Sequence, residues 1–362
     1  MGGQKGIACF YGAFSSLLPV TLVSTKNNAN PGNIEFEFLP ILSNSTNRYY
    51  NPFLLVTLKK IIQERKSTHL ILEHPYYGWL GILLKLFFKI KLVVHSHNIE
   101  SLRFKSTGKW WWRILWQYEK FVHRMADVNF FITDEDHEYA VKKFNLKKEK
   151  CNTITYGFDF SKPPSDEEKS IAKSKLYVKH NIPHHHKILL FNGTLDYKPN
   201  LDAVEHIVHY INPILLNEID FNYTIIICGK NLPSEYEELK SHQNIIYAGF
   251  VDDINLYFMG ADIFINPVID GGGIKTKLVE ALGNNLCCIS TVEGAIGVPE
   301  NITNGRLKVV REKDWSSFAQ TIIKTDTRKG SIENVFFNHF YWGNIAAKAK
   351  KIIDDDYCQS TL

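Results

Sequence analysis

The 362-residue sequence has no long uncharged apolar run, no C-x-x-C pair and no large excess of charge of either sign. Without C-x-x-C pairs, neither a structural zinc site nor a disulfide framework is expected. A net charge of +4, with no zinc-finger or ribonucleoprotein motif, argues against a dedicated nucleic-acid binder. Most of the six cysteines lie inside apolar runs, which is typical of buried thiols in a reducing compartment: Cys9, Cys228, Cys287 and Cys288.

Neither a membrane span nor a signal peptide is indicated. The nearest candidate for a span, residues 78–94, carries Lys85, Lys89 and Lys91. Residues 6–23 are interrupted by glycine, serine and proline, and Lys5 is the one basic residue that precedes them. We therefore expect a first strand, a turn and a helix start in this segment, and a cytoplasmic protein.

Short apolar runs alternate with amphipathic stretches of ten or more residues, which is typical of βα units with parallel sheets. The series is interrupted at residues 166–186, which are rich in charge, serine and histidine and which we interpret as a linker. The expected strands are residues 7–11, 69–72, 91–95, 128–132, 151–155, 188–192, 223–228, 244–248, 262–266, 286–290 and 307–310.

The length suits two domains, and we predict an α/β fold of two Rossmann-like, doubly wound domains that face each other across a cleft. The domains are expected at residues 1–165 and 187–335. Because ligands of open α/β sheets bind beyond the carboxyl ends of the strands, the loops after the strands are the candidates for a site.

The most informative segment is ADIFINPVIDGGGIKTKLVEAL, residues 261–282. An apolar strand is followed by Gly271, Gly272 and Gly273 and then by residues of helical composition. Glycines let backbone N–H groups approach a ligand closely, and a helix start adds unpaired N–H groups and the positive end of its dipole. Lys275 lies in the expected first turn and adds a formal charge, so the segment predicts a diphosphate site.

Glu280 follows Gly273 by seven residues, which is about two helical turns and about 10 Å along the axis. A diphosphate at the helix start would place an attached ribose beside this carboxylate, which can accept hydrogen bonds from both ribose hydroxyls. A glycine-rich loop with a merely solvated glutamate is the alternative interpretation of the same residues.

Two earlier segments accompany this motif in the same order and spacing as in a known family. They are NGTLDYKPN, residues 192–200, and GFVDD, residues 249–253, each after an expected strand. Together the three segments resemble the carboxyl-terminal domain of the retaining family-four glycosyltransferases (glycosyl transferases group 1), which have the GT-B fold. The resemblance implies a Leloir-type hexosyl- or related transferase that moves a sugar from a UDP- or GDP-sugar to a hydroxyl acceptor.

The resemblance also implies roles for individual residues. Lys198 and Lys275 would stabilise charge on the leaving diphosphate, Glu280 would hold the ribose, and the backbone at Phe250 and Val251 would lie against the base. The remaining donor-binding candidates contribute mainly through backbone N–H groups: Gly193, Gly271, Gly272, Gly273, Ile274 and Thr276.

The chain departs from the family pattern at two positions. Gly272 stands where the family commonly has the first glutamate of an E-x7-E motif, which resembles a GGG-T-R/K-x-K subgroup with Lys275 and Lys277 at the basic positions. Thr194 stands where an arginine commonly follows the first glycine of the earlier loop. We infer that Lys275 supplies the charge of that arginine.

The amino-terminal half resembles the family less closely. VVHSHNIE, residues 93–100, is similar to a segment that ends in H-N-(I/V)-E, and Thr155 to Asp159 are similar to the sequence that closes the first domain. The resemblance implies that a histidine of this half contacts the donor sugar, for which His97 and His74 are candidates. The expected sugar or acceptor pocket comprises Tyr11, Gly12, Glu73, His74, His97 and Asn98.

The last expected helix, residues 344–356 within 336–362, would pack back onto the first domain, as it does in the family. Retention is generally assigned there to a same-face path in which the leaving diphosphate deprotonates the acceptor. No protein nucleophile, cofactor or metal is required, and Asp252 and Asp253 are interpreted as a helix cap.

Basic residues and tryptophans are concentrated in residues 80–124. Between Lys85 and Arg124 there are nine Lys/Arg, two Asp/Glu and Trp110, Trp111, Trp112 and Trp116. This composition is typical of a peripheral contact with an anionic membrane, such as the inner face of the plasma membrane, and would suit a lipid-linked rather than a soluble saccharide acceptor. A core helix with buried tryptophans is the equally weighted alternative.

Three other functions stay open. A nucleotide-sugar epimerase or a sugar-phosphate synthase would keep the fold, and a non-catalytic nucleotide-binding scaffold would keep the donor site without turnover. A Rossmann oxidoreductase is disfavoured because no G-x-G-x-x-G follows the first expected strand.

Overall fold

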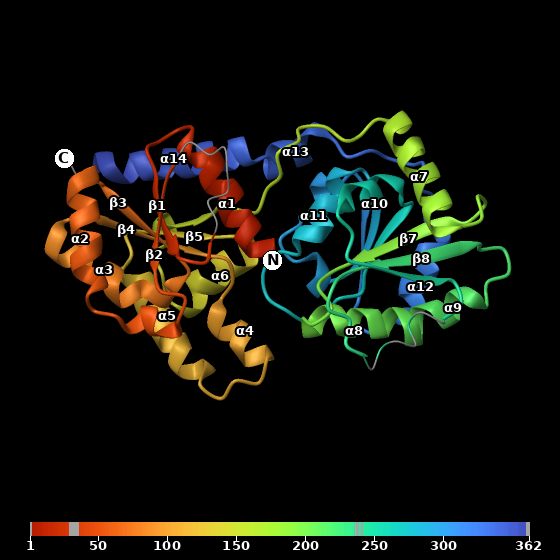
Figure 1. Ribbon diagram of the computed structural model, residues 1–362, viewed down its shortest axis with the longest axis horizontal. Coiled ribbons are helices and arrows are strands. Elements are labelled where there is room, and N and C mark those ends of the chain that lie inside the picture. Colours follow the sequence, from red (N-terminus) through yellow and green to blue (C-terminus); the bar gives the residue numbers. More distant parts are fainter. Residues whose placement is uncertain (1, 29–35, 235, 237–238, 240–241, 360–362) are drawn as a thin grey trace. The chain divides into compact units, whose positions relative to one another are not determined.

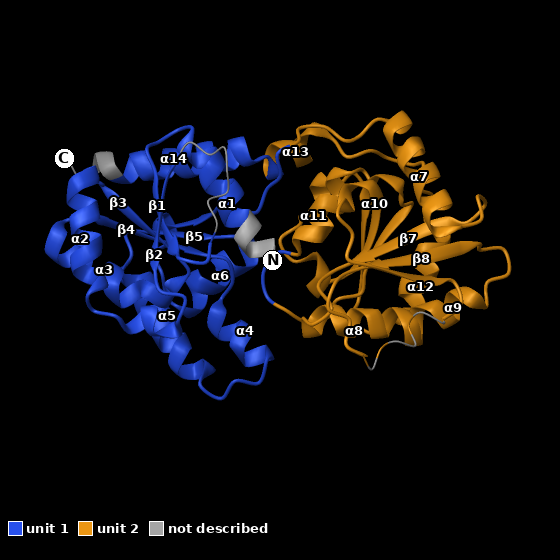
Figure 2. Ribbon diagram, in the orientation of Figure 1, with its two compact units in different colours: residues 1–159, 272–274, 340–362 blue, residues 160–271, 275–339 orange. Residues whose placement is uncertain are grey.

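The computed structural model describes residues 2–28, 36–234, 236, 239 and 242–359, and it divides into two compact units (Figures 1 and 2). Unit 1 comprises residues 1–159, 272–274 and 340–362, and unit 2 comprises residues 160–271 and 275–339. The expected linker, residues 166–186, contains helix α7 (Asp166–His180), which belongs to unit 2 and packs against α10 (Ile254–Gly260).

Unit 2 is built on a six-stranded parallel sheet in the order β12-β11-β10-β7-β8-β9. Because helices cover both faces of a parallel sheet, the sequences of its central strands are continuous apolar runs. Every residue of β8 is accordingly buried. The strands are β7 (Lys187–Asn192), β8 (Tyr223–Cys228), β9 (Ile245–Gly249), β10 (Ile263–Asn266), β11 (Cys287–Thr291) and β12 (Leu307–Val310).

Polar side chains cap the starts of three helices of unit 2, α7, α10 and α12 (Trp315–Lys324). Ser165 and Glu168 form a capping box at the start of α7. Asp253 accepts hydrogen bonds from the N–H groups of Asn255 and Leu256 at the start of α10, so its predicted role as a cap is confirmed. The other helices are α8 (Lys198–His206), α9 (Asn212–Leu216), α11 (Thr276–Gly283) and α13 (Asn334–Phe340).

Unit 1 contains two separate parallel sheets. One has four strands in the order β3-β4-β5-β6, and the other pairs β1 (Thr21–Thr25) with β2 (Glu37–Leu42). The four strands are β3 (His69–Glu73), β4 (Lys91–Ser96), β5 (Val128–Phe131) and β6 (Cys151–Thr153). The helices are α1 (Gly2–Ser15), α2 (Leu54–Arg65), α3 (Gly78–Phe88), α4 (Glu100–Ser106), α5 (Trp112–Met125), α6 (Asp134–Lys143) and α14 (Trp342–Gln359).

The prediction of a strand at residues 7–11 is wrong, because this segment lies inside helix α1. Phe10, Tyr11 and Phe14 are buried, and their spacing of one, three and four residues places them on one face of a helix. The helix also packs against α14. The sequence prediction missed β1 and β2, whose residues are half-buried or exposed and lack a clear alternation.

An aspartate has the same structural role in each unit. Asp127 precedes β5, accepts from the N–H of Leu92 at 2.9 Å and pairs with Lys85. Asp262 precedes β10, accepts from the N–H of Ile188 at 2.8 Å and pairs with Lys173. Each aspartate therefore ties the start of its own strand to the start of a neighbouring strand. Within the described ranges, no helix combines the length and apolarity that crossing a bilayer requires.

Candidate active site

The glycine loop, residues 271–273, lies between the carboxyl end of β10 and the start of α11. Gly271 and Gly273 have φ values of 95° and 72°, a left-handed conformation that other residues seldom adopt. A Cβ atom on Gly271 would lie 2.9 Å from the hydroxyl oxygen of Tyr197, so the loop also approaches the segment after β7 closely. The loop geometry thus requires glycine at both positions.

Helix α11 starts at Thr276, later than the sequence predicts, and Lys275 occupies its N-cap position. The Lys275 side chain makes no capping hydrogen bond, and the first N–H groups of a helix point out of its start, here toward the loop. The ammonium of Lys275 donates to the carbonyl of Gly271 and lies 3.9 Å from a carboxylate oxygen of Glu293. Lys275 therefore folds back over the glycine loop.

Lys277 lies beneath the same loop. Its ammonium donates to Oδ1 of Asn200 at 2.9 Å and lies 4.3 Å from the centre of the Phe191 ring. Burial, and to a smaller extent the charge of Lys275, lowers the pKa of Lys277 to about 7. An anion bound at the loop would favour the charged form of this lysine.

Three loops at the carboxyl end of this sheet approach one another closely. A Cβ on Gly193, after β7, would lie 2.7 Å from the Asn200 side chain. A Cβ on Gly229, after β8, would lie 2.0 Å from the carbonyl oxygen of Gly193. The Asn200 amide also donates to the carbonyl of Thr194 at 3.0 Å, so Asn200 joins the earlier loop to Lys277.

The other predicted donor-binding residues differ in exposure, and all of them except Ile274 belong to unit 2. The Lys198 side chain is 81% exposed and pairs with Asp202 at 2.7 Å on α8. Phe250 is 70% exposed after the left-handed Gly249, and Val251 is partly exposed. Glu280 is partly buried on the second turn of α11, and Ile274 and Thr276 flank its start.

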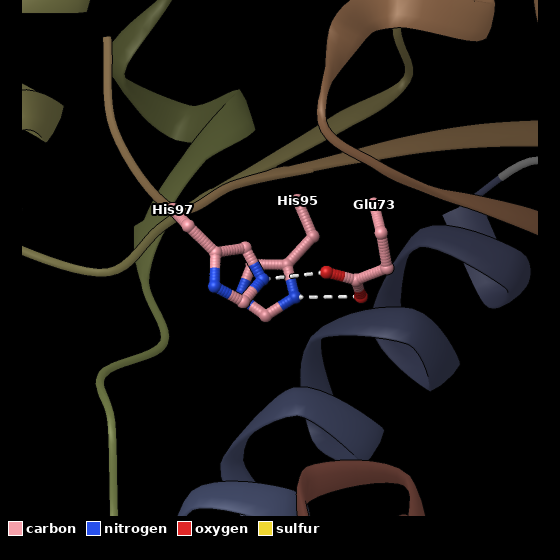
Figure 3. A group of neighbouring side chains, drawn as sticks. All are labelled: Glu73, His95 and His97. Atoms are coloured by element: carbon pink, nitrogen blue, oxygen red, sulfur yellow. Dashed lines mark hydrogen bonds and ion pairs between the residues drawn. The ribbon is translucent and has the colours of Figure 1, made fainter. Parts of the chain in front are cut away.

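Unit 1 contains a compact cluster of Glu73, His95 and His97 (Figure 3). Glu73 ends β3, His95 lies in the neighbouring β4, and His97 follows that strand. The two carboxylate oxygens of Glu73 bond separately to the histidines, at 3.1 Å to Nδ1 of His95 and 2.6 Å to Nε2 of His97. Burial acts to raise the pKa of Glu73, but the two histidines outweigh it and hold the pKa well below its usual range.

Tyr11 joins this cluster from helix α1. Its buried hydroxyl donates to Oε1 of Glu73 at 2.6 Å, and burial followed by the Glu73 charge raises the pKa of Tyr11 well above its usual value. We expected Tyr11 and Gly12 in a loop after a strand. They instead lie within α1, so Tyr11 contributes its side chain and Gly12 is a helix residue.

His74 has an unusual backbone conformation for a residue with a side chain, with φ 68° and ψ 158°. Its N–H donates to the carbonyl of His95, its Nδ1 lies 3.2 Å from Oε1 of Glu100, and its ring centre is 4.8 Å from that of His97. Such strain persists only where the surroundings fix it and is concentrated at functional sites. The two candidate histidines are therefore in contact.

Glu100 is the second carboxylate of this region. Burial acts to raise its pKa, but His74, Arg103 and Tyr76 outweigh that effect and lower it to about 2. Asn98 donates at 3.3 Å to Oε1 of Glu100, the oxygen that His74 also contacts. Behind it, Glu119 accepts from the N–H groups of Glu100 and Ser101 and so caps α4.

Among the described residues, Glu73, His95 and His97 are the one set with ligand atoms that all lie within 4.8 Å of one another. Nitrogen and carboxylate ligands of this kind suit zinc. Each carboxylate oxygen already bonds an imidazole, however, and this arrangement equally serves to orient the two rings. The expectation that no metal is required stays a prediction.

Sequence reasoning missed several residues of both clusters. In the sequence, His95 is one more residue of an apolar strand. Arg103 and Tyr76, which bond Glu100, belong to no motif that would single them out. Gly229 follows β8 directly, as Gly193 follows β7, and this position is the signal that could have identified it. Asn200 lies instead within helix α8.

Two family models match the chain. The model described as Glycosyltransferase Family 4 matches residues 19–162, and the model described as Glycosyl transferases group 1 matches residues 186–325. These segments contain the Glu73–His95–His97 cluster and the glycine loops, respectively.

The curated relatives match at low identity, as two of them illustrate. A protein from the cps region of Klebsiella pneumoniae, described as uncharacterized, is 28% identical over 177 residues, which are 46% of this chain and 44% of that protein. The chitobiosyldiphosphodolichol beta-mannosyltransferase of Debaryomyces hansenii is 24% identical over 327 residues, which are 79% of this chain and 67% of that protein. The matches to these two relatives therefore span from less than half to about two thirds of their length.

Solved structures share the fold over nearly the whole chain. A glycosyltransferase from Rickettsia africae has a TM-score of 0.74 at 16% identity and covers 98% of this chain and 95% of its own. Anabaena HepE, in a complex with UDP and glucose, has a TM-score of 0.70 at 15% identity, and the match covers 98% of this chain and 97% of HepE. With two parallel α/β units, a glycine loop at a helix start and these family matches, the chain belongs to the GT-B glycosyltransferases of group 1.

Proposed function

We propose that this chain transfers a sugar, with retention of configuration, from a UDP- or GDP-sugar to a hydroxyl acceptor. The observation that carries the proposal is the glycine loop at the start of α11, where Lys275 bonds the Gly271 carbonyl and Lys277 lies two residues further along. HepE binds UDP and glucose on the same fold, which supports a nucleotide-sugar donor. No cofactor or metal is required in this scheme.

The proposed diphosphate site uses backbone and side-chain donors together. N–H groups of Gly272, Gly273 and Ile274 and the start of α11 bind phosphate oxygens, as helix starts do in other phosphate sites. Lys275 and Lys277 add positive charge in a partly desolvated setting, where such interactions are stronger than in water. A bound diphosphate draws Lys277, with its pKa of about 7, to the charged form.

The remaining donor contacts follow from the order of the loops. Glu280, one further turn along α11, binds the ribose hydroxyls, and Phe250 and Val251 contact the base. Gly193 and Thr276 complete the binding surface. Lys198, which is now paired with Asp202, has a flexible and exposed side chain that can move to a phosphate.

In the transfer step, the bond between the anomeric carbon and the diphosphate oxygen breaks and a bond to the acceptor oxygen forms on the same face. The acceptor proton goes to a leaving phosphate oxygen. The protein stabilises the charge that develops on the diphosphate, for which Lys198 and Lys275 are proposed. His97 and His74 contact the sugar or acceptor, and Glu73 and Asn98 hold this part of unit 1 in place.

The donor is identified by incubating the purified chain with UDP- and GDP-sugars and measuring both thermal stabilisation and nucleotide release. We expect one donor to stabilise the chain, and release to require a saccharide or lipid-linked acceptor. Glu280→Gln should weaken binding, whereas the exposed Glu218→Gln is the matched control. Turnover of the donor with no added acceptor would indicate an epimerase, a requirement for a sugar phosphate would indicate a synthase, and binding without release would refute catalysis.

We propose further that the chain works in surface polysaccharide or glycolipid assembly, at the cytoplasmic face of the plasma membrane. The cps-region relative and the mannosyltransferase relative, whose name specifies a diphosphodolichol substrate, support a lipid-linked acceptor. Trp110 is 81% exposed, and Ile114 and Phe121 on α5 are also exposed. Trp116 instead packs against Phe144 and is not part of this surface.

A vesicle assay tests the membrane contact. Replacing Trp110 and Ile114 by serine should weaken binding to anionic vesicles at least tenfold, because exposed apolar side chains insert at the interface. The same double replacement at Val178 and Ile219, which are exposed on unit 2, is the control. Vesicle binding that survives loss of Trp110 and Ile114 would contradict the contact.

A further inference from the structure

Glu73, His95 and His97, the three residues drawn in Figure 3, are brought together by the parallel pairing of β3 and β4. Glu73 is the register partner of His95 across the two strands. His97 follows His95 by two residues, and alternate residues of an extended segment point to the same side. The two rings therefore face the same carboxylate, and their centres lie 4.9 Å apart.

The separations between the facing atoms suit a small metal ion. Nδ1 of His95 lies 3.1 Å and Nε2 of His97 lies 2.6 Å from separate oxygens of Glu73, and the ligand atoms of the three residues all lie within 4.8 Å of one another. Zinc binds nitrogen and oxygen at about 2.0–2.2 Å in a tetrahedron, which places neighbouring ligand atoms roughly 3.3 Å apart. Side-chain movements of about 1 Å therefore suffice to bring the three ligand atoms into this geometry.

The carboxylate of Glu73 needs a positive charge beside it. Its oxygens contact the two imidazoles and the hydroxyl of Tyr11, and within the described ranges no lysine or arginine pairs with it. A carboxylate removed from water is costly unless a positive charge accompanies it. Two protonated rings whose centres are 4.9 Å apart would repel each other, whereas a single metal ion would hold both rings and the carboxylate together.

The surroundings orient the three side chains and leave the cluster open on one side. The buried hydroxyl of Tyr11 donates to Oε1 of Glu73 at 2.6 Å. Nε2 of His95 is buried and, within the part of the chain that the structure describes, has no hydrogen-bond partner, so Nδ1 is the ligand atom of that ring. The side chains of Glu73 and His97 are 17% and 15% exposed, so water can reach a further coordination position.

We propose that Glu73, His95 and His97 bind a zinc ion and that this ion inhibits sugar transfer. Two nitrogen ligands and one oxygen ligand suit zinc, whereas Mg²⁺ and Ca²⁺ take oxygen ligands. The ion replaces the hydrogen atoms that join each ring to the carboxylate, and water completes its coordination. The inhibition rests on the proposed function, in which His97 contacts the sugar or the acceptor, because a ring bound to the ion cannot make that contact.

Cobalt titration of the full chain, purified without an affinity tag, tests the site. Co²⁺ enters zinc sites and absorbs visible light more strongly in a tetrahedral site than in water. We expect one equivalent of Co²⁺ per chain to give this absorption, and zinc but not Mg²⁺ to abolish it. Glu73→Gln and His97→Gln should each weaken cobalt affinity at least about tenfold, and Tyr11→Phe, which removes a hydrogen bond to a ligand residue, about tenfold.

The matched control is His185→Gln, in the run of three histidines that follows α7. His185 is exposed and lies outside the cluster, so this variant should bind cobalt as the parent chain does. Equal cobalt affinity in Glu73→Gln, His97→Gln and the parent chain, or loss of the absorption in His185→Gln alone, overturns the proposal. If circular dichroism shows that the variants of the cluster do not fold, crystals of the parent chain grown with zinc locate the ion by anomalous scattering, and zinc bound only away from Glu73 overturns the proposal.

Sugar transfer at free zinc concentrations set by a chelator tests the inhibition. We expect the rate to fall at least about tenfold as zinc displaces cobalt, and to recover when the chelator removes the zinc. A rate that stays unchanged while the site fills overturns the inhibition. Cobalt absorption does not depend on turnover, so failure of transfer with every donor would refute the proposed function, whereas failure of the cluster to bind cobalt would refute the zinc site.

Discussion

His74 offers a direct test of whether backbone strain is maintained at the site. At φ 68° and ψ 158° its conformation is open to glycine but costs a residue with a Cβ about 1–3 kcal/mol. Replacing His74 by alanine or by glycine removes the same imidazole and the same contact with Glu100. The two variants therefore differ in backbone strain and in the freedom of the unfolded chain.

We expect His74→Gly to be more stable than His74→Ala. Glycine relieves about 1–3 kcal/mol of strain and loses about 0.4–1 kcal/mol to the greater freedom of the unfolded chain, which leaves roughly 1 kcal/mol in its favour. Urea denaturation, with equal slopes for the two variants, measures this difference. The matched pair Ala140→Gly on helix α6 should show the opposite order, since alanine is favoured in a helix.

An alanine variant at position 74 that is as stable as the glycine variant would refute the strain. Both variants should transfer sugar much more slowly than the parent chain, because both lack the imidazole beside His97. A glycine variant with full activity would show that His74 is a structural residue alone.

Three further predictions concern charged groups. The parent chain should become more stable as the pH rises from 7 to 10, because the pKa of Lys277 is about 7 in the native state and 10.5 when unfolded, so the unfolded chain holds more protons. Lys277→Met should remove this rise in the free energy of unfolding. Its slope, at most about 1.4 kcal/mol per pH unit, is measured by urea denaturation at pH 7–10. Glu119→Gln should remove a fall in stability between pH 4.5 and 7 in the same measurement, because burial raises its native pKa to about 7 and the native state holds the extra proton. Glu73→Gln should slow transfer about a hundredfold while circular dichroism stays unchanged, since the amide keeps the shape but cannot hold both imidazoles by charge.

Much of the fold follows from the order of apolar runs. Apart from residues 7–11, every predicted strand is a strand in the structure, with ends that differ by two residues or fewer. The central strands β5, β8, β10 and β11 are buried on both faces, so their sequences are continuous and distinctive. Residues 7–11 are apolar too, but their buried side chains follow the period of a helix, and a five-residue window is too short to separate the two patterns.

The site was predictable where a motif specifies the backbone. Gly271 and Gly273 have left-handed conformations, which is why glycine is needed there, and a helix follows the loop, although it starts later than expected. The partners of Glu73 were less accessible from sequence. Its contact with Tyr11 joins residues 62 positions apart, and such a pairing depends on how α1 packs against the sheet.

Lys275, at the N-cap of α11, and Lys277, within α11, make other contacts than the sequence led us to infer. Thr194 stands where the family commonly has an arginine, and Lys275 was expected to supply the missing charge. The ammonium of Lys275 instead bonds to the carbonyl of Gly271 within its own loop. The lysine that reaches the loop containing Thr194 is Lys277, through Asn200, whose amide in turn bonds the Thr194 carbonyl. A buried lysine costs more to charge than an exposed arginine, and its charge is therefore coupled to occupancy by an anion. The basic group beside the loop that contains Thr194 is thus Lys277, which titrates near pH 7. Donor binding above pH 7 should therefore be accompanied by uptake of a proton by Lys277.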